Sequence, residues 1–433
     1  MSLQQSKQNT LSVLLLLPKE SYRCDEFLQA ADALGIEVIV ARNLCHRLAS
    51  NWKLDRLLSL PFDNPEAAAQ LVQQELAGQA PQAVIGVDDS GIEVAAAIAE
   101  ALHVESNTQL AVETLHDKYR FRKLQQQLGL PFPAFSPMRI SGHRINREHK
   151  IDFPVVAKPT RLSGSRGVIR VDAAEKLDET IDRIGDIIHH SKVKSSGISL
   201  LLEQYLDGSE HALEAMMDKG EAKVLAIFDK PDPLEGPYFE ETIYLTPSHL
   251  SQDIRREFQR QVELICQQAG ILNGPVHAEA RVHHDTVTLL EVAPRSIGGS
   301  CGKVLRHALG MSLEELILRC ALGEVVPDFN HSGPAVGVMM LPVPMAGIFN
   351  GIDGIEQVQV MPGIESVEVS ARSGDRVIPL PEESTYLGFI FASGESPESV
   401  VSALRAAKDK LRIRIKPILK VTASGGQAGL SNL

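Results

Sequence analysis

The chain has 433 residues, of which 44% are hydrophobic and 23% charged, a composition that predicts two or three folded domains. Its 43 Lys and Arg residues against 55 Asp and Glu residues give a net charge of −12. Because such a surface repels phosphate backbones and anionic lipids, we expect neither nucleic-acid binding nor membrane-surface binding. A small anionic ligand held in a local basic pocket is still compatible with this charge.

The apolar runs and the cysteines point to a protein of the reducing cytoplasm. No apolar run approaches the roughly 20 residues that a bilayer span needs, and the run from Val13 to Leu17 is followed by Pro18. This run has no small-residue cleavage site after it, so a signal peptide is not expected. The five cysteines form no C-x-x-C pair, which argues against a disulfide framework or a structural zinc site.

The first 110 residues alternate strand and helix patterns, as in a parallel βαβ unit. The pattern predicts strands over 11–17, 36–40 and 83–87 and helices over 25–34, 65–77 and 92–102. The dinucleotide-binding G-x-G-x-x-G is missing after the first strand. Parallel sheets bind ligands at the carboxyl ends of their strands, which here include Asp88 to Gly91. Glu93, on the next helix, is a candidate for binding a substrate amine.

The rest of the chain divides into two patterns. A basic helix is expected near 115–128, and residues 150–295 mix strands and helices. From Gly333 onward, short strands alternate with Gly and Pro until a helix over 397–410, for which Ser396 is the predicted N-cap. The changes of pattern predict three domains, over residues 1–112, 113–328 and 329–433.

The most informative segment is a predicted hairpin with strands over 276–282 and 286–292. Because successive side chains of a strand point to opposite faces, His277, Glu279 and Arg281 share one face.

The turn of this hairpin decides which carboxylates meet. If it centres on Asp285, Glu279 lies opposite Glu291. Like charges directly opposed destabilise a ribbon, so something must offset them. One interpretation is a divalent cation between the two carboxylates, and hard oxygen ligands suit Mg²⁺. The alternative is a solvated acidic pair on an exposed strand.

Basic residues flank this hairpin in the sequence. Arg295, four residues after Glu291, would suit a transferring phosphoryl group, although a surface arginine is the alternative. Lys158 ends a predicted strand and leads into the loop 163–168, whose small residues let backbone N–H groups approach phosphate oxygens. An ordinary glycine-containing turn is the alternative there.

A further strand is predicted over 200–206, followed by a polar turn that contains Glu210. An extended backbone beside apolar residues can hydrogen-bond an adenine edge, and a nearby carboxylate can hold ribose hydroxyls. The alternative is a strand with a polar turn.

Taken in order, these segments resemble the ATP-grasp superfamily of carboxylate–amine ligases. The resemblance covers about residues 110 to 325 and rests on the segments 117–122, 155–159, 163–168, 203–206, 208–210, 277–281 and 291–295. Within the superfamily the chain is most similar to the L-amino-acid ligase branch, which makes dipeptides or similar amides. The resemblance implies an ATP-grasp fold, α/β and α+β in class. It adds an N-terminal βαβ (pre-ATP-grasp) domain, a central domain with a mobile lid and a C-terminal α+β domain.

The resemblance also implies roles for the matching residues. Lys118 and Lys158 would hold the α- and β-phosphates of ATP. The loop residues that would fold over the γ-phosphate are Ser163, Gly164, Ser165, Gly167 and Val168. Adenine would be bound by Glu203 and the backbone of Gln204, Tyr205 and Leu206, and ribose by Glu210. The metal ligands would be Glu279 and Glu291, and the catalytic residue Arg295 would stabilise the transferring phosphate. His277 is a second candidate catalytic residue because it shares a strand face with Glu279, where it would contact the substrate or support Glu279.

The implied reaction is an ATP-dependent ligation through an acyl phosphate, which releases ADP and phosphate. Its cofactors would be ATP and Mg²⁺, with Mn²⁺ as an alternative. Its partners would be two small molecules, a carboxylate that is expected to be an amino acid and an amine. The resemblance also implies a homodimer. Ala293 stands where many ATP-grasp enzymes carry Asn, which leaves the number of metal ions open.

Three other functions remain open at this point. One is another ATP-grasp ligase, such as a purine-pathway or biotin-carboxylase-like enzyme. The second is a serine hydrolase that uses Ser300, because residues 298–302 fit G-x-S-x-G. The third is a nucleotide-binding protein without catalysis.

Overall fold

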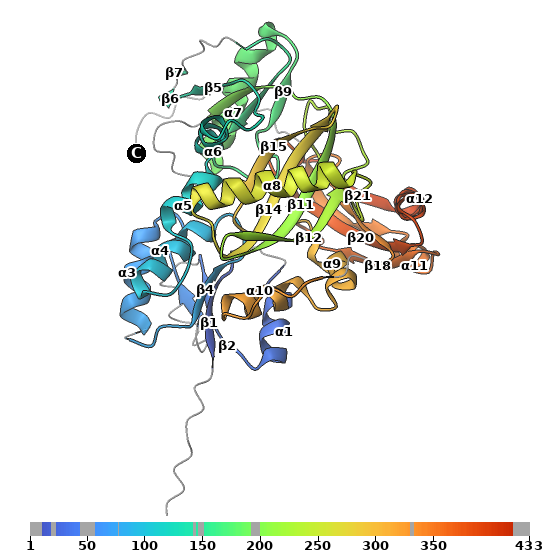
Figure 1. Ribbon diagram of the computed structural model, residues 1–433. Coiled ribbons are helices and arrows are strands. Elements are labelled where there is room, and N and C mark those ends of the chain that lie inside the picture. Colours follow the sequence, from blue (N-terminus) through green and yellow to red (C-terminus); the bar gives the residue numbers. More distant parts are fainter. Residues whose placement is uncertain are drawn as a thin grey trace, which may run out of the picture.

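The computed structural model describes residues 11–18, 23–43, 57–76, 78–141, 144–145, 151–191, 200–329 and 333–418. The N-terminal part is a parallel four-stranded sheet in the order β3-β2-β1-β4, shown in blue in Figure 1. Its strands are β1 (Ser12–Leu16), β2 (Glu37–Arg42), β3 (Leu57–Ser59) and β4 (Ala83–Gly86). The accompanying helices are α1 (Cys24–Leu34), α3 (Pro65–Leu76) and α4 (Ile92–Leu102).

The apolar run of β1 is explained by burial on both faces of this sheet. Val13 and Leu15 pack in one core cluster, and Leu14 and Leu16 pack in another that contains residues of α3 and α4. The predicted parallel βαβ unit is therefore confirmed. Helix α1 ends where the sequence predicts, because Gly35 takes up the left-handed conformation with φ of 65°.

The basic segment after this sheet contains two helices rather than one. Helix α5 (Gln109–His116) is followed directly by α6 (Lys118–Gln127). The Asp117 side chain separates them, since it accepts hydrogen bonds from the backbone N–H groups of Tyr119 and Arg120, both at 3.0 Å. The helix predicted from residue 115 therefore begins at residue 118.

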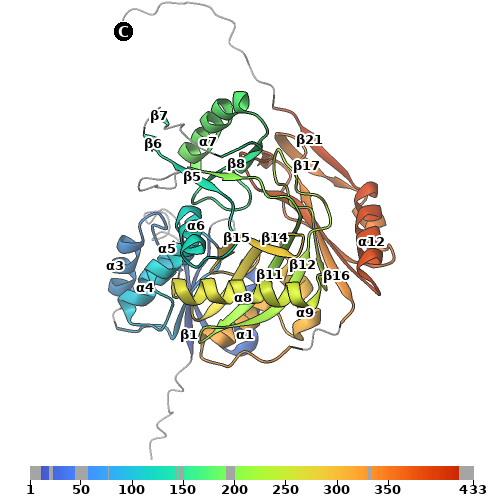
Figure 2. The same ribbon diagram turned by 45° about the horizontal axis from the view of Figure 1, so that its top comes forward.

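A smaller antiparallel sheet in the order β5-β10-β8-β9 follows, and it is green in Figures 1 and 2. Its strands are β5 (Phe135–Met138), β8 (Val155–Pro159), β9 (Ile169–Val171) and β10 (Leu200–Gln204). The other elements nearby are α7 (Leu177–Ser191), the 3₁₀ helix η1 (Ala174–Lys176) and the ribbon of β6 (Ile140–Ser141) and β7 (Arg144–Ile145). Leu177, Ile181 and Ile184 of α7 pack on this sheet. Strand β10 ends two residues earlier than the sequence predicts.

The largest sheet has eight antiparallel strands in the order β15-β14-β11-β12-β13-β16-β20-β18. Its first part consists of β11 (Ser209–Asp218), β12 (Glu221–Asp229), β13 (Ile243–Thr246), β14 (Gly274–His283) and β15 (Thr286–Ala293). Its second part consists of β16 (Ala335–Pro342), β18 (Ile364–Val369) and β20 (Tyr386–Gly394). Because β13 pairs with β16, this sheet continues across the boundary predicted near residue 328.

Helices and one small sheet surround the large sheet, as Figures 1 and 2 show. The helices are α8 (Gln252–Ala269), α9 (Gly302–Leu309), α10 (Leu313–Ala321), α11 (Ile355–Gln359) and α12 (Pro397–Lys410). The small sheet has the order β19-β17-β21, from β17 (Gly347–Asp353), β19 (Arg376–Val377) and β21 (Arg412–Lys416). Helix α12 has the predicted bounds and the predicted Ser396 cap.

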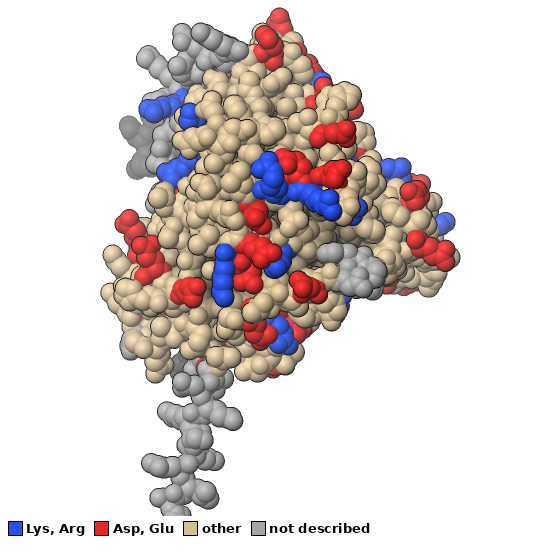
Figure 3. Space-filling model, in the orientation of Figure 1, with Lys and Arg blue, Asp and Glu red and all other residues tan. Residues whose placement is uncertain are grey.

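Surface charge is mixed rather than segregated on the face shown in Figure 3, where acidic and basic side chains intermingle. On helix α8, for example, Arg260 and Glu257 form an ion pair at 2.7 Å. Within the described ranges, every helix is too short or too polar to cross a membrane.

Candidate active site

A cavity of about 1540 Å³ collects the predicted site residues. It is lined by the ends of the N-terminal sheet, the β8–β10 sheet, strands of the large sheet and the segment 370–389. Every residue given a role by the ATP-grasp resemblance lines this cavity except Gly167, whereas Glu93 and Ser300 do not line it. Residues far apart in the chain are thus brought to one place, as a shared site requires.

The β14–β15 ribbon brings two carboxylates face to face in this cavity. Glu279 pairs directly with Glu291, as the sequence predicts. The turn consists of His284 and Asp285, with φ of 43° and 62°, and it would by itself place Glu279 opposite Leu290. A β-bulge next to Glu279 shifts the pairing by one residue and restores the predicted opposition.

Both opposed carboxylates are partly open to the cavity. Their side chains are 21% exposed for Glu279 and 24% for Glu291. Glu291 Oε2 lies 3.2 Å from Lys118 Nζ, and Glu279 Oε1 lies 2.7 Å from Lys230 Nζ. Although burial acts to raise the pKa of Glu279, Lys230 and His277 hold that pKa well below its usual range. Two opposed, partly accessible carboxylates at this spacing fit the oxygen donors that Mg²⁺ prefers.

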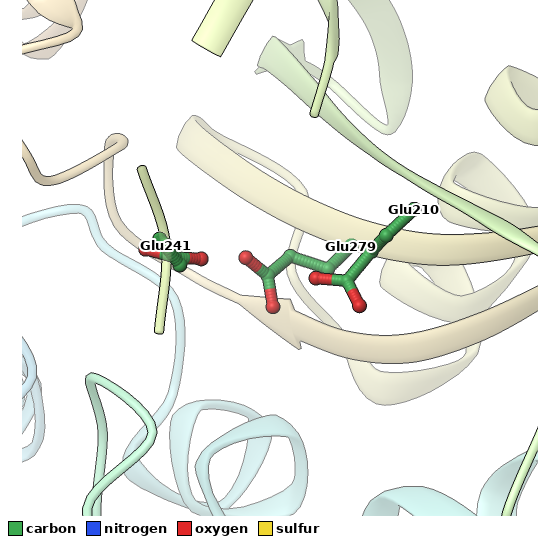
Figure 4. Close-up of side chains that lie close together, drawn as sticks. All are labelled: Glu210, Glu241 and Glu279. Atoms are coloured by element: carbon green, nitrogen blue, oxygen red, sulfur yellow. The ribbon is translucent and has the colours of Figure 1, made fainter. Parts of the chain in front are cut away.

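Lys230 is the centre of a cluster that the sequence did not predict. Its ammonium, with a side chain 3% exposed, lies 2.8 Å from Glu210, 2.7 Å from Glu241 and 2.7 Å from Glu279. Figure 4 shows the carboxyl groups of Glu210 and Glu279 close together, with that of Glu241 across from them. Tyr244 Oη also donates to Glu241, at 2.6 Å. Burial acts to lower the pKa of Lys230, but the three carboxylates raise it well above its ordinary value.

At the β8–β10 sheet, Glu203 is enclosed by two cations. Its carboxylate lies 2.7 Å from Arg122 Nε and 2.6 Å from Lys158 Nζ. Burial, aided by Arg122 and opposed by Glu203, lowers the pKa of Lys158 to about 8. The Glu203 carboxylate, predicted for adenine, is thus occupied by protein cations, whereas the segment 204–206 lines the cavity.

Arg122 also explains how the bulge in the ribbon is stabilised. Its fully buried guanidinium donates to the carbonyl oxygens of Leu289 at 3.1 Å and Leu290 at 2.8 Å. Leu290 is the residue that the bulge leaves without a pairing partner. A buried carbonyl without a donor is costly, so Arg122 favours the register that opposes Glu279 and Glu291.

Arg295 connects the ribbon with the N-terminal sheet. Its Nε lies 2.9 Å from Asp89 Oδ1, at the carboxyl end of β4, where parallel sheets bind their ligands. Burial acts to raise the pKa of Asp89, but Arg295 outweighs it and lowers that pKa. Glu93 is placed differently from its predicted role, because its carboxylate is taken by His116 at 2.7 Å and by Arg161.

His277 lies between two carboxylates. Its Nδ1 is 3.4 Å from Glu214, and its Nε2 is 3.6 Å from Glu279. Burial acts to lower the pKa of His277, but these neighbours raise it to about 9. Glu214 also accepts the backbone N–H of Ile297, at 3.0 Å, and so fixes the chain just after Arg295. This arrangement fits a supporting role for His277 as well as substrate contact.

The glycine loop 163–168 packs against the C-terminal part. Gly164 and Gly167 have φ of 63° and 68°, a conformation that favours glycine. The Gly167 N–H donates to Pro381 O at 2.8 Å, and Arg166 Nε donates to Glu382 O at 3.2 Å. The loop therefore lines the cavity and is also hydrogen-bonded to residues 381–382.

The geometry around Ser300 does not match a nucleophile elbow. Such a serine sits at the tip of a strand, whereas β15 ends at Ala293, well before the turn 298–302. A hydrolase would also need a histidine as its base, and His331, which follows Ser300 in the chain, lies outside the described residues.

Three family comparisons cover most of the chain. Residues 28–104 match the ATP-grasp N-terminal domain, residues 151–304 the ATP-grasp domain, and residues 339–416 the L-amino acid ligase C-terminal domain 2. The crystal structure of an L-amino acid ligase from Bacillus licheniformis superposes with a TM-score of 0.78 and 26% identity, over 94% of this chain and 99% of that one. The chain belongs to the ATP-grasp superfamily.

Its position near the L-amino-acid ligase branch and its ATP-grasp fold are thus confirmed. Another similar fold is the biotin carboxylase domain of the Hydrogenobacter thermophilus 2-oxoglutarate carboxylase, solved with MgADP. It has a TM-score of 0.66 at 16% identity and covers 94% of this chain and 91% of that one.

Two curated relatives share 24% identity with this ATP-grasp protein. They are the uncharacterized protein y4rH of Sinorhizobium fredii, matched over 71% of this chain, and the carbamoyl phosphate synthase large chain of Thermomicrobium roseum, matched over 70%. The match spans 63% of the first relative and 28% of the second.

Proposed function

We propose that this ATP-grasp protein is an ATP-dependent ligase that joins the carboxylate of an amino acid to an amine, releasing ADP and phosphate. One observation carries the proposal: Glu279 and Glu291 oppose each other in the same cavity as Lys118, Lys158 and Arg295. Two carboxylates and three cations around one space suit the transfer of a phosphoryl group.

The nucleotide would lie along the Lys118 and Lys158 side of the cavity. These ammonium groups would bind its phosphates, and the glycine loop 163–168 would cover the terminal phosphate. The backbone of 204–206 would bind adenine, because the Glu203 carboxylate is already paired. Glu210 would accept from ribose while Lys230 and Arg281 hold it, at 2.8 and 3.2 Å.

The reaction would proceed in two displacements. An oxygen of the substrate carboxylate attacks the γ-phosphorus, and the bond to the ADP oxygen breaks, which gives an acyl phosphate. The amine nitrogen then attacks the acyl carbon, loses a proton, and phosphate leaves. Mg²⁺ held by Glu279 and Glu291 would supply neutralisation of the phosphate charge.

The protein's own groups have defined tasks in this scheme. Arg295 would exchange Asp89 for the transferring phosphate, and the lysines would hold the leaving ADP. The glycine loop, packed on Pro381 and Glu382, would keep water from the acyl phosphate, which otherwise hydrolyses.

The comparisons support an amino-acid substrate over the other ATP-grasp reactions. The C-terminal match is to an L-amino acid ligase domain, and the Bacillus licheniformis enzyme is similar over nearly its whole length. The N5-carboxyaminoimidazole ribonucleotide synthetase of Thermotoga maritima, at 13% identity and a TM-score of 0.68, shares the fold.

The test is an ADP-release screen over pairs of amino acids with ATP and Mg²⁺, with mass spectrometry of the product. We expect ADP release that depends on an added free carboxylate, an amide product, and no turnover in EDTA. Full turnover in EDTA would refute the proposal. ATP binding without any amino-acid-dependent ADP release would instead support a non-catalytic nucleotide-binding protein. Loss of activity in S300A but not in E291Q would support a serine hydrolase.

A further inference from the structure

The cluster around Lys230 joins three elements of the large sheet through one buried cation. Glu210 lies on β11, Glu279 on β14, and Glu241 just before β13, and all three carboxylates are within 2.8 Å of Lys230 Nζ. Lys230 itself does not line the cavity, whereas its three carboxylate partners do. The ammonium therefore acts from behind the cavity wall.

The side-chain contacts of Glu279 are all made to the same carboxylate oxygen. Oε1 is 2.7 Å from Lys230 Nζ, 3.3 Å from Tyr244 Oη and 3.6 Å from His277 Nε2. Within the described part of the chain, these are the side-chain partners of Glu279, and none of them takes Oε2. The carboxylate is therefore fixed by one oxygen, and the other is left for a ligand in the cavity.

We propose that Lys230 is a positioning residue for cation binding: by holding Oε1 of Glu279, it presents Oε2 to the Mg²⁺ that Glu279 and Glu291 would share. This inference rests on the proposed function. Partners behind a metal ligand orient it, and their removal typically lowers metal affinity 10- to 100-fold.

The same cluster suggests a rival interpretation, with an opposite prediction. Oxygens of Glu210, Glu241 and Glu279 lie within 4.8 Å of one another, close enough to surround a metal ion. Lys230 Nζ already lies within hydrogen-bonding distance of all three, so an ion could bind there only if the ammonium moved away. If the cluster were such a site, removing Lys230 would strengthen cation binding instead of weakening it.

The experiment measures the affinity for Mg²⁺ separately from the affinity for nucleotide. The full-length protein is mixed with a fluorescent ATP analogue and titrated with MgCl₂, and nucleotide binding is measured again in EDTA. For K230M we expect the Mg²⁺ affinity to fall 10- to 100-fold. Nucleotide affinity in EDTA should fall less than the Mg²⁺ affinity, because Arg281 still holds the proposed ribose ligand Glu210, at 3.2 Å. A matched control is K223M, since Lys223 lies on β12 and pairs with the exposed Glu221. It should leave both affinities unchanged.

Thermal unfolding of each variant shows whether it is folded. If K230M does not fold, K230R and Y244F carry the test. Lys230 remains in Y244F, but Glu279 Oε1 loses its 3.3 Å contact, so we expect a three- to tenfold loss of Mg²⁺ affinity. Unchanged Mg²⁺ affinity in folded K230R and Y244F would overturn the inference, as would unchanged or higher affinity in folded K230M.

The variant E279Q separates this inference from the proposed function. If E279Q keeps the wild-type Mg²⁺ affinity, the proposed metal site itself is wrong, and the role of Lys230 falls with it. If E279Q loses Mg²⁺ affinity and folded K230M does not, only the inference about Lys230 is wrong. Loss in both variants, with K223M unchanged, supports it.

Discussion

Glu203 in the β8–β10 sheet and Glu291 in the β14–β15 ribbon line the same cavity, but their carboxylates are held very differently. Glu203 has a side chain 4% exposed, and both of its oxygens contact cations, from Arg122 and Lys158. Glu291 is 24% exposed and, within the part of the chain that the structure describes, forms one ion pair, at 3.2 Å, with Lys118. Removing a buried carboxylate that pairs with two cations would leave those cations buried and unpaired. A partly exposed carboxylate with one ion pair can still bind a ligand.

The largest expected effect is on activity, at Glu291. E291Q keeps the shape of the side chain and removes the charge, so ADP release should fall by about 1000-fold, as for other groups that stabilise transition-state charge. The free energy of unfolding should change by about 1 kcal/mol or less. The matched control E356Q, at an exposed site on α11, should keep full activity.

Glu203 should show the reverse behaviour, with a large effect on stability. E203A leaves two buried cations without their shared partner, so the free energy of unfolding should fall by about 3–5 kcal/mol in urea denaturation. A loss as small as that of E291Q would contradict the contrast between the two sites.

Asp89 is an intermediate case. Its side chain is 16% exposed, and among the described residues it forms an ion pair with Arg295, at 2.9 Å. D89N should therefore lower the free energy of unfolding by about 1.5–3 kcal/mol, the range for a hydrogen bond to a charged group. D253N is the control, because Asp253 is 93% exposed, 3.7 Å from Arg256, and its replacement should leave unfolding in urea nearly unchanged.

The smallest expected effect is a pH dependence of nucleotide affinity. Bound phosphate favours the protonated ammonium of Lys158, whose pKa is lowered to about 8 by burial. Affinity for ATP should thus be constant below pH 8 and fall about tenfold per pH unit above it. The decrease should stop where the pH reaches the higher pKa that Lys158 has in the complex with ATP. The variant K158M should bind weakly at all these pH values and lose this slope. If the pH dependence of ATP affinity persists in K158M, the titrating group is not Lys158.

Elements with strong local patterns were predictable from the sequence. The bounds of α4 and α12 match the prediction, and Ser396 caps α12 as its hydroxyl chemistry implies. Helix α6 begins later than predicted because the Asp117 carboxylate accepts its first backbone N–H groups and so caps the helix at Lys118.

The opposition of Glu279 and Glu291 shows where local reasoning needs tertiary structure. The sequence located the hairpin and its turn within one residue. The final register depends on a bulge at Leu290, and the donor that satisfies its carbonyl, Arg122, is 168 residues away. Backbone hydrogen bonding alone would leave the pairing one residue off.

The amino-acid order by itself determined the alternation of strands and helices, the ribbon that carries the two acidic side chains, and the glycine loop. Only the tertiary structure decided which charges meet. Lys230 is 20 residues from Glu210 and 49 from Glu279, and it reaches both because β11 lies between β14 and β12 in the sheet. Strand order is set by packing and hydrogen bonding over the whole chain, so it leaves no local pattern from which such a cluster can be predicted.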